Sequence, residues 1–215
     1  MEDMLKKIGD EILNYEHDKV VGACRKALDS GNSPEEVFTS LVEGVRKITK
    51  MYQEDDYYLP DFIMAVETFG VAMDFLHTML LKKESDAIVV GTVKGSVHDS
   101  GKNLLRDLLR GSGYRVYDLG VNVESERFIE KIKEENAKVL CVGVYMSRSR
   151  MGVEEILKGL KETWLRDKIK ILIGGYSASQ RYVNKVEVDA YADDVFKGAE
   201  IVRNWMEKEE EEIPG

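Results

Sequence analysis

The sequence predicts a chain in two parts, an all-helical N-terminal part and an α/β C-terminal part built on a parallel sheet. Residues 2–83 repeat apolar side chains at three- and four-residue spacing and contain almost no strand signal. From residue 87 onward, short apolar runs rich in β-branched residues alternate with helical segments, as in parallel sheets covered by helices. The short polar segment 82–86 separates the two patterns and is the expected linker. We therefore expect domains at 1–83 and 87–215.

Four helices are expected in the N-terminal part. Apolar periodicity marks the first helix over Leu5–Leu13 and the second over Val20–Leu28. The third begins after Ser33, where a capping hydroxyl precedes Pro34 and two acidic residues. The fourth carries apolar side chains at helical spacing over 59–80. Short connections between amphipathic helices predict a four-helix bundle.

Five strands with intervening helices are expected in the C-terminal part. The expected strands lie at 87–93, 114–118, 139–144, 170–174 and 190–191. Ser125 and Asp194 are expected to cap the helices that follow them, and the acidic end of the chain, 207–212, is expected to be frayed and solvated. A strand order of 2-1-3-4-5, the flavodoxin-like arrangement of a Rossmann-type sheet, is the simplest closure with right-handed crossovers.

Composition and charge argue against several classes of function. The net charge of -9, without a cluster of Lys and Arg, argues against nucleic acid as a partner. No run is long and apolar enough for a membrane span, and the first residues lack the apolar core of a signal peptide, so we expect a cytoplasmic protein. Cys24 and Cys141 lie far apart in apolar contexts, which indicates two reduced, buried thiols. With three histidines in the chain, we do not expect a metal site built from several imidazoles.

The loop between the first strand and its helix carries His98, flanked by Gly95 and Gly101. Such a loop lies at the carboxyl end of a parallel strand, where α/β sheets bind ligands, and the glycines permit close approach. A histidine there can present one ring nitrogen to a metal while the other is hydrogen-bonded. A lone histidine in a lone loop more often packs, so the interpretation depends on the surrounding sequence.

That surrounding sequence, Gly91-Thr-Val-Lys-Gly95 with His98-Asp99 and Gly101-Lys-Asn103, resembles the Asp-x-His-x-x-Gly motif of cobalamin-binding domains. The form is that of methyl-carrying corrinoid proteins of methanol and methylamine methyltransferase systems, and of the corresponding module of methionine synthase. The resemblance implies that His98 is the lower axial ligand of cobalt, in place of the cofactor's dimethylbenzimidazole. It also implies that the N-terminal bundle, through the segment 57–64, is a cap over the upper face of the cofactor.

Further cofactor-contacting residues follow from the same resemblance. Gly174-Gly175 matches the family's paired glycines, which leave a slot for the nucleotide tail of the cofactor. Gln180 also falls where the family places a similar residue. The resemblance implies that His98 is the metal ligand and that the chain has no catalytic residue. It implies that the following residues bind the cofactor: Gly95, Ser96, Val97, His98, Asp99, Gly101, Val144, Met146, Arg148, Gly174, Gly175, Tyr191 and Asp194.

Three departures from the family pattern change what is expected. Ser96 replaces the family's acid before the histidine, and this loss removes the negative partner that raises imidazole basicity. The family's Ser-x-Leu after the third strand falls on Val144 and Met146. Arg148 and Arg150 stand where the family has small hydroxyl residues, and they are expected either to meet cofactor amides or phosphate or to point to solvent. His98 should therefore be a weaker ligand than its counterparts.

The function implied by the resemblance is that of a methyl carrier. Cobalamin would take a methyl group from a substrate-specific methyltransferase and give it to a second methyltransferase with a thiol or folate-type acceptor, without turnover by the carrier alone. A reductive activase is a further candidate partner. Two alternatives stay open: a corrinoid-sensing or degenerate regulatory module without methyl transfer, and a flavodoxin-like phosphate binder, which the lack of a phosphate cradle disfavours. The methyl donor and acceptor are not identified by the sequence.

Overall fold

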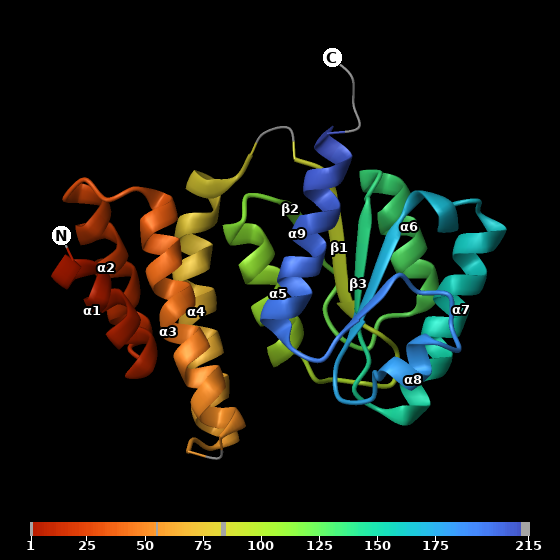
Figure 1. The fold of residues 1–215 in the computed structure, drawn as a ribbon, viewed down its shortest axis with the longest axis horizontal. Helices are drawn as coiled ribbons and strands as arrows, with labels where there is room; N and C mark the ends of the chain where they lie inside the picture. The colour runs from red at the N-terminus through yellow and green to blue at the C-terminus, as the bar shows by residue number, and fades with distance from the viewer. Residues whose placement is uncertain (1, 55, 83–84, 212–215) are drawn as a thin grey trace. The chain divides into compact units, whose positions relative to one another are not determined.

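A computed structural model describes residues 2–54, 56–82 and 85–211 of the 215-residue chain (Figure 1). The described chain separates into two compact units, one containing the first four helices and the other containing the strands. Buried apolar side chains fill the interior of both units. Within the predicted linker, residues 83 and 84 lie outside the described residues.

The first unit is the helical one, as the sequence predicts. Its helices are α1 (Glu2–Leu13), α2 (His17–Asp29), α3 (Pro34–Gln53) and α4 (Leu59–Leu80). The start of α3 is fixed by a capping box, in which the N–H of Glu36 donates to Oγ of Ser33 and the N–H of Ser33 donates to the Glu36 carboxylate. The predicted cap at Ser33 is therefore confirmed. Cys24 is buried in this unit as a free thiol.

Helix α4 is long and apolar enough to be considered for a membrane span, with a mean hydropathy of 1.3 over its most apolar window. The expectation that no run reaches this length and hydropathy is therefore wrong. The bundle accounts for the hydropathy, because 44% of that window is buried inside the protein, including Phe69, Met73 and Leu76. A helix whose apolar residues pack against three neighbours has the composition of a core helix.

The second unit contains a five-stranded parallel sheet in the order β2-β1-β3-β4-β5, which confirms the predicted order. Its strands are β1 (Ala87–Thr92), β2 (Arg115–Asp118), β3 (Val139–Gly143), β4 (Lys170–Gly174) and β5 (Ala190–Ala192). They are connected by helices α5 (Ser100–Gly111), α6 (Ser125–Glu135), α7 (Arg150–Glu162) and α8 (Gln180–Val183), by the 3-10 turns η1 (Ser147–Ser149) and η2 (Arg166–Lys168), and are followed by α9 (Val195–Glu211).

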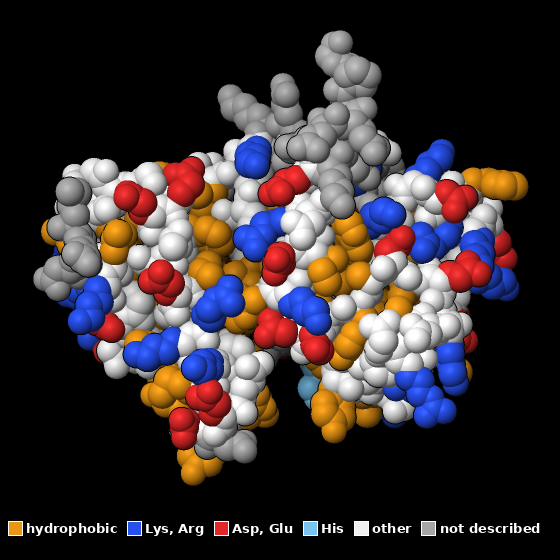
Figure 2. All heavy atoms as spheres, viewed as in Figure 1, with side chains coloured by type: hydrophobic (Ala, Val, Ile, Leu, Met, Phe, Trp, Pro, Cys, Tyr) orange, Lys and Arg blue, Asp and Glu red, His pale blue; other side chains and the backbone are white. Residues whose placement is uncertain are grey.

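The sheet has helices on both faces, with α5 and α9 on one and α6 and α7 on the other (Figure 1). Side chains alternate between these faces along each strand. Leu140 and Val142 belong to the core under α6 and α7, whereas Cys141 and Leu172 line a cavity between α5 and α9. Outside this core, Lys, Arg, Asp and Glu side chains are interspersed over the surface seen in Figure 2.

Of the two helix caps predicted in the sheet unit, at Asp194 and Ser125, the structure contains one. Asp194 caps α9, since its carboxylate accepts the N–H groups of Phe196 and Lys197 at 2.6 and 3.1 Å. Ser125 is not a cap: it is the first residue of α6, Glu124 occupies the cap position, and the Ser125 hydroxyl donates to Glu126. The backbone of α9 stays helical to Glu211, so the predicted fraying does not begin at residue 207.

Candidate functional site

The loop between β1 and α5 presents His98 at the carboxyl edge of the sheet. The hydroxyl of Thr92, at the end of β1, donates to the carbonyl oxygen of His98 at 3.0 Å. Gly95 has φ +85, a left-handed conformation that glycine adopts without a steric cost. The N–H of Gly95 donates to Oδ1 of Asn122 at 2.8 Å, across the neighbouring loop. These bonds fix the backbone of the loop while the histidine side chain remains exposed.

The imidazole of His98 is held by one weak hydrogen-bonding partner and by one aromatic ring. Oγ of Ser96 lies 3.4 Å from Nδ1 of His98 and 3.4 Å from its backbone nitrogen, both long for hydrogen bonds. The ring of Tyr145 stacks on the imidazole, with centroids 5.5 Å apart and planes inclined by 24°. Among the residues that the structure describes, Nε2 of His98 accepts or donates no hydrogen bond. That nitrogen is available to a ligand.

A cavity of ≈ 170 Å³ opens at the same edge of the sheet, between α5 and α9. Its walls include Lys102 and Leu105 of α5, Tyr145 after β3, and Val195 of α9. Five lining residues are glycines, namely Gly101, Gly143, Gly174, Gly175 and Gly198. Backbone without Cβ atoms leaves a slot that larger residues would fill. The cavity therefore contains the paired glycines that the sequence assigns to a nucleotide tail.

Gly175 could not be replaced without strain. Its φ is +103, and a Cβ atom at this position would lie 2.8 Å from the carbonyl oxygen of Val144. Gly174 is less constrained, because a Cβ atom there would lie 3.4 Å from the carbonyl oxygen of Ala192. The end of β4 lies so close to the loop after β3 that position 175 must be glycine.

The structure puts Val144 and Tyr145 on opposite sides of the sheet. Val144 is fully buried in the core under α6 and α7, so its side chain does not face the cavity. Tyr145 lines the cavity and contacts His98. Sequence reasoning selected Val144 and passed over Tyr145. The signal that could have found it is strand alternation, since Cys141, Gly143 and Tyr145 share the cavity side of the chain.

Three other predicted residues lie on the rim of this edge. Val97, next to His98 in the sequence, is a large apolar residue that is 73% exposed. Met146 is 37% exposed, and its sulfur accepts from a guanidinium nitrogen of Arg148 at 3.6 Å. Arg148 forms no ion pair among the described residues, so its charge is open to solvent.

The guanidinium of Arg150, by contrast, is hydrogen-bonded within the protein. Its guanidinium donates to the carbonyl oxygen of Ser177 at 3.0 and 2.8 Å and lies 5.0 Å from the ring centroid of Tyr182. The hydroxyl of Tyr182 donates back to the carbonyl oxygen of Arg150 at 2.9 Å. Arg150 therefore links the start of α7 to the loop before α8. Of the two arginines, only Arg148 has a guanidinium that could bind a ligand at this edge.

The remaining predicted residues divide between the cavity and other roles. Asp194 lines the cavity and caps α9. Asp99 directly precedes α5, and it accepts the side-chain amide of Asn103 at 3.2 Å and the backbone N–H of Asn103 at 2.7 Å. Tyr191 packs against the core under α6 and α7, away from the cavity. Gln180 donates to Asn184 at the surface. The structure thus brings together the histidine loop, the glycines and Asp194, but not Val144 or Tyr191.

An ion pair between a buried lysine and a partly exposed aspartate anchors the start of α5, a few residues after the histidine. Nζ of Lys102 donates to the carboxylate of Asp118 at 2.5 Å, and the Lys102 side chain is only 5% exposed. Burial would raise the pKa of Asp118, but hydrogen bonds from Lys102 and from the N–H of Gly120, together with the charge of Arg106, lower it below its usual value. This pair fixes α5 against β2. Sequence analysis gave no sign of it.

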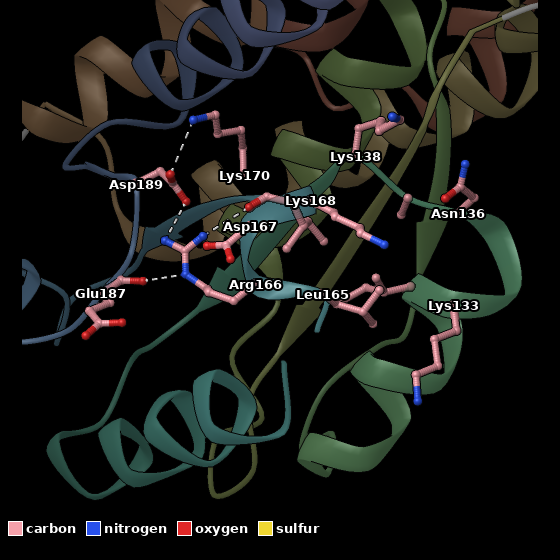
Figure 3. A pocket seen from close by; sticks show the side chains of 13 residues that line it. Lys133, Asn136, Lys138, Leu165, Arg166, Asp167, Lys168, Lys170, Glu187 and Asp189 are labelled. Carbon is pink, nitrogen blue, oxygen red and sulfur yellow. Dashed lines mark hydrogen bonds and ion pairs between the residues drawn. The ribbon is translucent and has the colours of Figure 1, made fainter. Parts of the chain in front are cut away.

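A larger hollow of ≈ 700 Å³ lies elsewhere on the sheet unit, around β4 and η2 (Figure 3). It is open, and three of its charged side chains pair with one another. Arg166 donates to the carbonyl oxygen of Glu187 at 2.9 Å and lies 3.0 Å from Asp189, which also pairs with Lys170. None of the unpartnered buried polar atoms found in the described chain lies there. Of the residues predicted from the sequence, Gly101, the paired glycines and Asp194 line the smaller cavity instead.

Comparisons with known proteins identify the family of this chain. Residues 87–202 match the family model described as "B12 binding domain", and residues 4–77 match a second model with the same description. The dimethylamine corrinoid protein of Methanosarcina barkeri is 31% identical over 196 residues, covering 89% of this chain and 92% of that protein.

Two solved structures share the fold along nearly the whole chain. A cobalamin-binding protein from Desulfitobacterium hafniense superposes with a TM-score of 0.69 at 25% identity, covering 94% of this chain and 98% of the other. A chain of the methanol:cobalamin methyltransferase complex from Methanosarcina barkeri superposes with a TM-score of 0.70 at 23% identity, covering 96% of this chain and 81% of the other. At 23% identity, the similarity to this second structure shows a shared fold alone.

Proposed function

The chain belongs to the family of corrinoid proteins with B12-binding domains, and we propose that it carries a methyl group on cobalamin between two methyltransferases. Its cofactor is cobalamin. The observation that carries the proposal is the imidazole of His98, with an unpartnered Nε2, at the same sheet edge as a glycine-lined cavity. The bound corrinoid would supply the methyl-accepting and methyl-donating chemistry through its cobalt.

The residues present fit such a cofactor. Nε2 of His98 would be the lower ligand, with Nδ1 turned toward Ser96, which is the arrangement usual for a metal-bound imidazole. The slot between α5 and α9 would hold the nucleotide tail, because its glycines leave room beside the sheet. Exposed apolar side chains on the rim, Val97 and Met146, would lie against the macrocycle and lose contact with water.

The helical unit would serve as the cap over the upper face of the cofactor. The segment 57–64 that opens α4 supports this role, since Tyr58 and Leu59 are 80% and 52% exposed. Exposed large apolar residues at one end of a bundle are available to cover another apolar surface. The chain would then work with a substrate-specific methyltransferase, a second methyltransferase for a thiol or folate-type acceptor, and a reductive activase, without turnover of its own.

Two buried thiols support a cytoplasmic location. Cys24 and Cys141 are free, and burial raises the pKa of each to about 12. Free cysteines that stay protonated are typical of proteins from reducing compartments.

One observation favours a second candidate, a corrinoid sensor without methyl transfer. The family's charged partner of the histidine is absent, and the hydroxyl of Ser96 is 3.4 Å from the ring. A weakly oriented imidazole dissociates more readily, which suits a protein that reports on the state of the cofactor.

Reconstitution with hydroxocobalamin followed by desalting tests cofactor binding, and we expect a red protein with stoichiometric cobalt. Methyl transfer then separates the two candidates. The loaded chain is supplied with methanol, monomethylamine, dimethylamine or trimethylamine and the methyltransferases encoded near its gene. Methylation of the bound cobalamin by one donor is the result expected of a carrier. A chain that retains cobalamin but is methylated with none of these systems would be a sensor.

A further inference from the structure

The ring of Tyr145 contacts both His98 and the glycine-lined cavity. It stacks on the imidazole of His98, with centroids 5.5 Å apart, and it also lines the glycine-rich slot. No other aromatic ring contacts His98 among the residues described. A group that enters the slot would therefore meet the same side chain that supports the imidazole.

The chain around Tyr145 is shaped to accept its ring. A Cβ atom on Gly101 would lie 2.8 Å from the Tyr145 hydroxyl oxygen, and one on Gly143 would lie 2.9 Å from Cε2 of the ring. Two glycines on different elements, α5 and β3, thus give the ring its space. Burial raises the pKa of the Tyr145 hydroxyl to about 12, while the backbone N–H of Lys102 acts in the opposite direction. The phenol is therefore neutral and directed at the start of α5.

The histidine depends on this ring because its other support is weak. Ser96 has no charge, and its hydroxyl lies 3.4 Å from Nδ1, at the long end of hydrogen-bond distances. A stacked aromatic pair at 5.5 Å with a small interplanar angle has favourable dispersion and quadrupole contacts. Stacking restricts the rotation of the imidazole about χ2, which a single long hydrogen bond does not.

We propose that Tyr145 is the positioning residue of His98 and couples occupation of the slot to the orientation of the imidazole. The nucleotide tail, once in the slot, would pack against the ring of Tyr145 and hold it on the histidine. Occupation of the slot would then stabilise the ligating orientation of a histidine that lacks a charged partner. This inference rests on the proposed function for its cofactor, but its first step concerns the protein alone.

The test uses the full chain with labelled histidine, as wild type, Tyr145→Phe and Tyr145→Ala. Nuclear magnetic resonance at one pH reads the ring-proton shifts of the three histidines without cofactor. We expect Tyr145→Ala to remove the ring-current shift of His98, and Tyr145→Phe to keep it. His17 and His77 lie in the helical unit, so unchanged shifts there show that this unit is intact, and an unchanged circular-dichroism melt shows that the sheet unit is folded. An unchanged His98 signal in a folded Tyr145→Ala variant would overturn the proposal.

The second arm loads the three proteins with cobalamin. Electron paramagnetic resonance of the Co(II) form reads the nitrogen splitting from the lower ligand, and equilibrium dialysis reads affinity. We expect Tyr145→Ala to lose part of the splitting and to bind about 2- to 10-fold more weakly, the range that corresponds to one aromatic contact. Tyr145→Phe should match wild type in both. Equal splitting and affinity in Tyr145→Ala would overturn the coupling.

The two arms also separate this inference from the proposed function. If wild type itself shows no nitrogen splitting, then His98 is not the ligand, and the part of the proposed function that assigns this role to His98 is wrong. In that case the shift of His98 in the cofactor-free protein still decides whether Tyr145 positions the ring.

Discussion

A Cβ atom on Gly175 would lie 2.8 Å from the carbonyl oxygen of Val144, so the end of β4 passes the loop after β3 at a distance that only glycine permits. The φ of +103 at Gly175 adds a second restriction. This glycine is therefore structural as well as a part of the slot. A substitution there cannot separate cofactor binding from folding.

Gly175→Ala should destabilise the protein by about 1–3 kcal/mol, the cost of a strained backbone position with a steric conflict. Urea unfolding measures it. Gly120→Ala is the matched control, because Gly120 has φ +83 but a Cβ atom there meets nothing within 4 Å. Only the left-handed conformation costs free energy in the control, so it should lose less. Equal losses would mean that the contact with Val144 relaxes freely.

Gly198→Leu is the better variant for blocking the slot. A Cβ atom on Gly198 would meet side-chain atoms of Ala192, Leu172 and Leu105 at 3.3 to 3.7 Å, near ordinary contact distances. The helix α9 tolerates leucine better than glycine. We expect a folded protein that no longer retains hydroxocobalamin through desalting. Gly22→Leu, at an exposed helical glycine with open space around it, should retain the cofactor. Retention by both variants would place the nucleotide tail elsewhere.

His98→Ala should remove the lower nitrogen ligand and leave the glycine-lined slot unchanged. We expect weaker but measurable cobalamin binding, because the contacts of the slot remain. The Co(II) spectrum of the variant should lack the nitrogen splitting from the protein. His17→Ala, in the helical unit, should give the wild-type spectrum. Identical spectra for wild type and His98→Ala would exclude His98 as the ligand.

Asp118→Asn should destabilise the protein at pH 7 by about 1.5–3 kcal/mol, the range for hydrogen bonds to a charged group. The pKa of Asp118 is lowered in the folded state, so its stabilising effect is complete above the unfolded pKa of about 3.9 and falls as pH drops through the folded value. Unfolding free energies of wild type and variant should therefore converge at acid pH. A difference that persists undiminished would show that the charge of Asp118 is not responsible.

Glu187→Gln is the control for that series. Glu187 pairs with Lys161, but their side chains are 68% and 52% exposed. Surface pairs of this kind contribute less than about 1 kcal/mol, so this variant should stay close to wild type across the pH range.

The sequence by itself determined the order of the elements. Helical spacing in the bundle, the β-branched runs of the strands and the cap at Ser33 are local patterns, and each requires only neighbours along the chain. The strand order followed as well, because right-handed crossovers leave few arrangements of five parallel strands. The loop around His98 and the pair Gly174-Gly175 were found through motifs of the same local kind.

Tertiary structure decided which side chains meet. A shift of one residue along β3 moves a side chain to the other face of the sheet, which is why Val144 is buried in the core while Tyr145 contacts His98. The pair Lys102 and Asp118 joins residues 16 apart on different elements, so no local pattern predicts it. Strand alternation fixes directions only once the register of each strand is known. That register is set by packing across the whole sheet, which the sequence alone does not reveal.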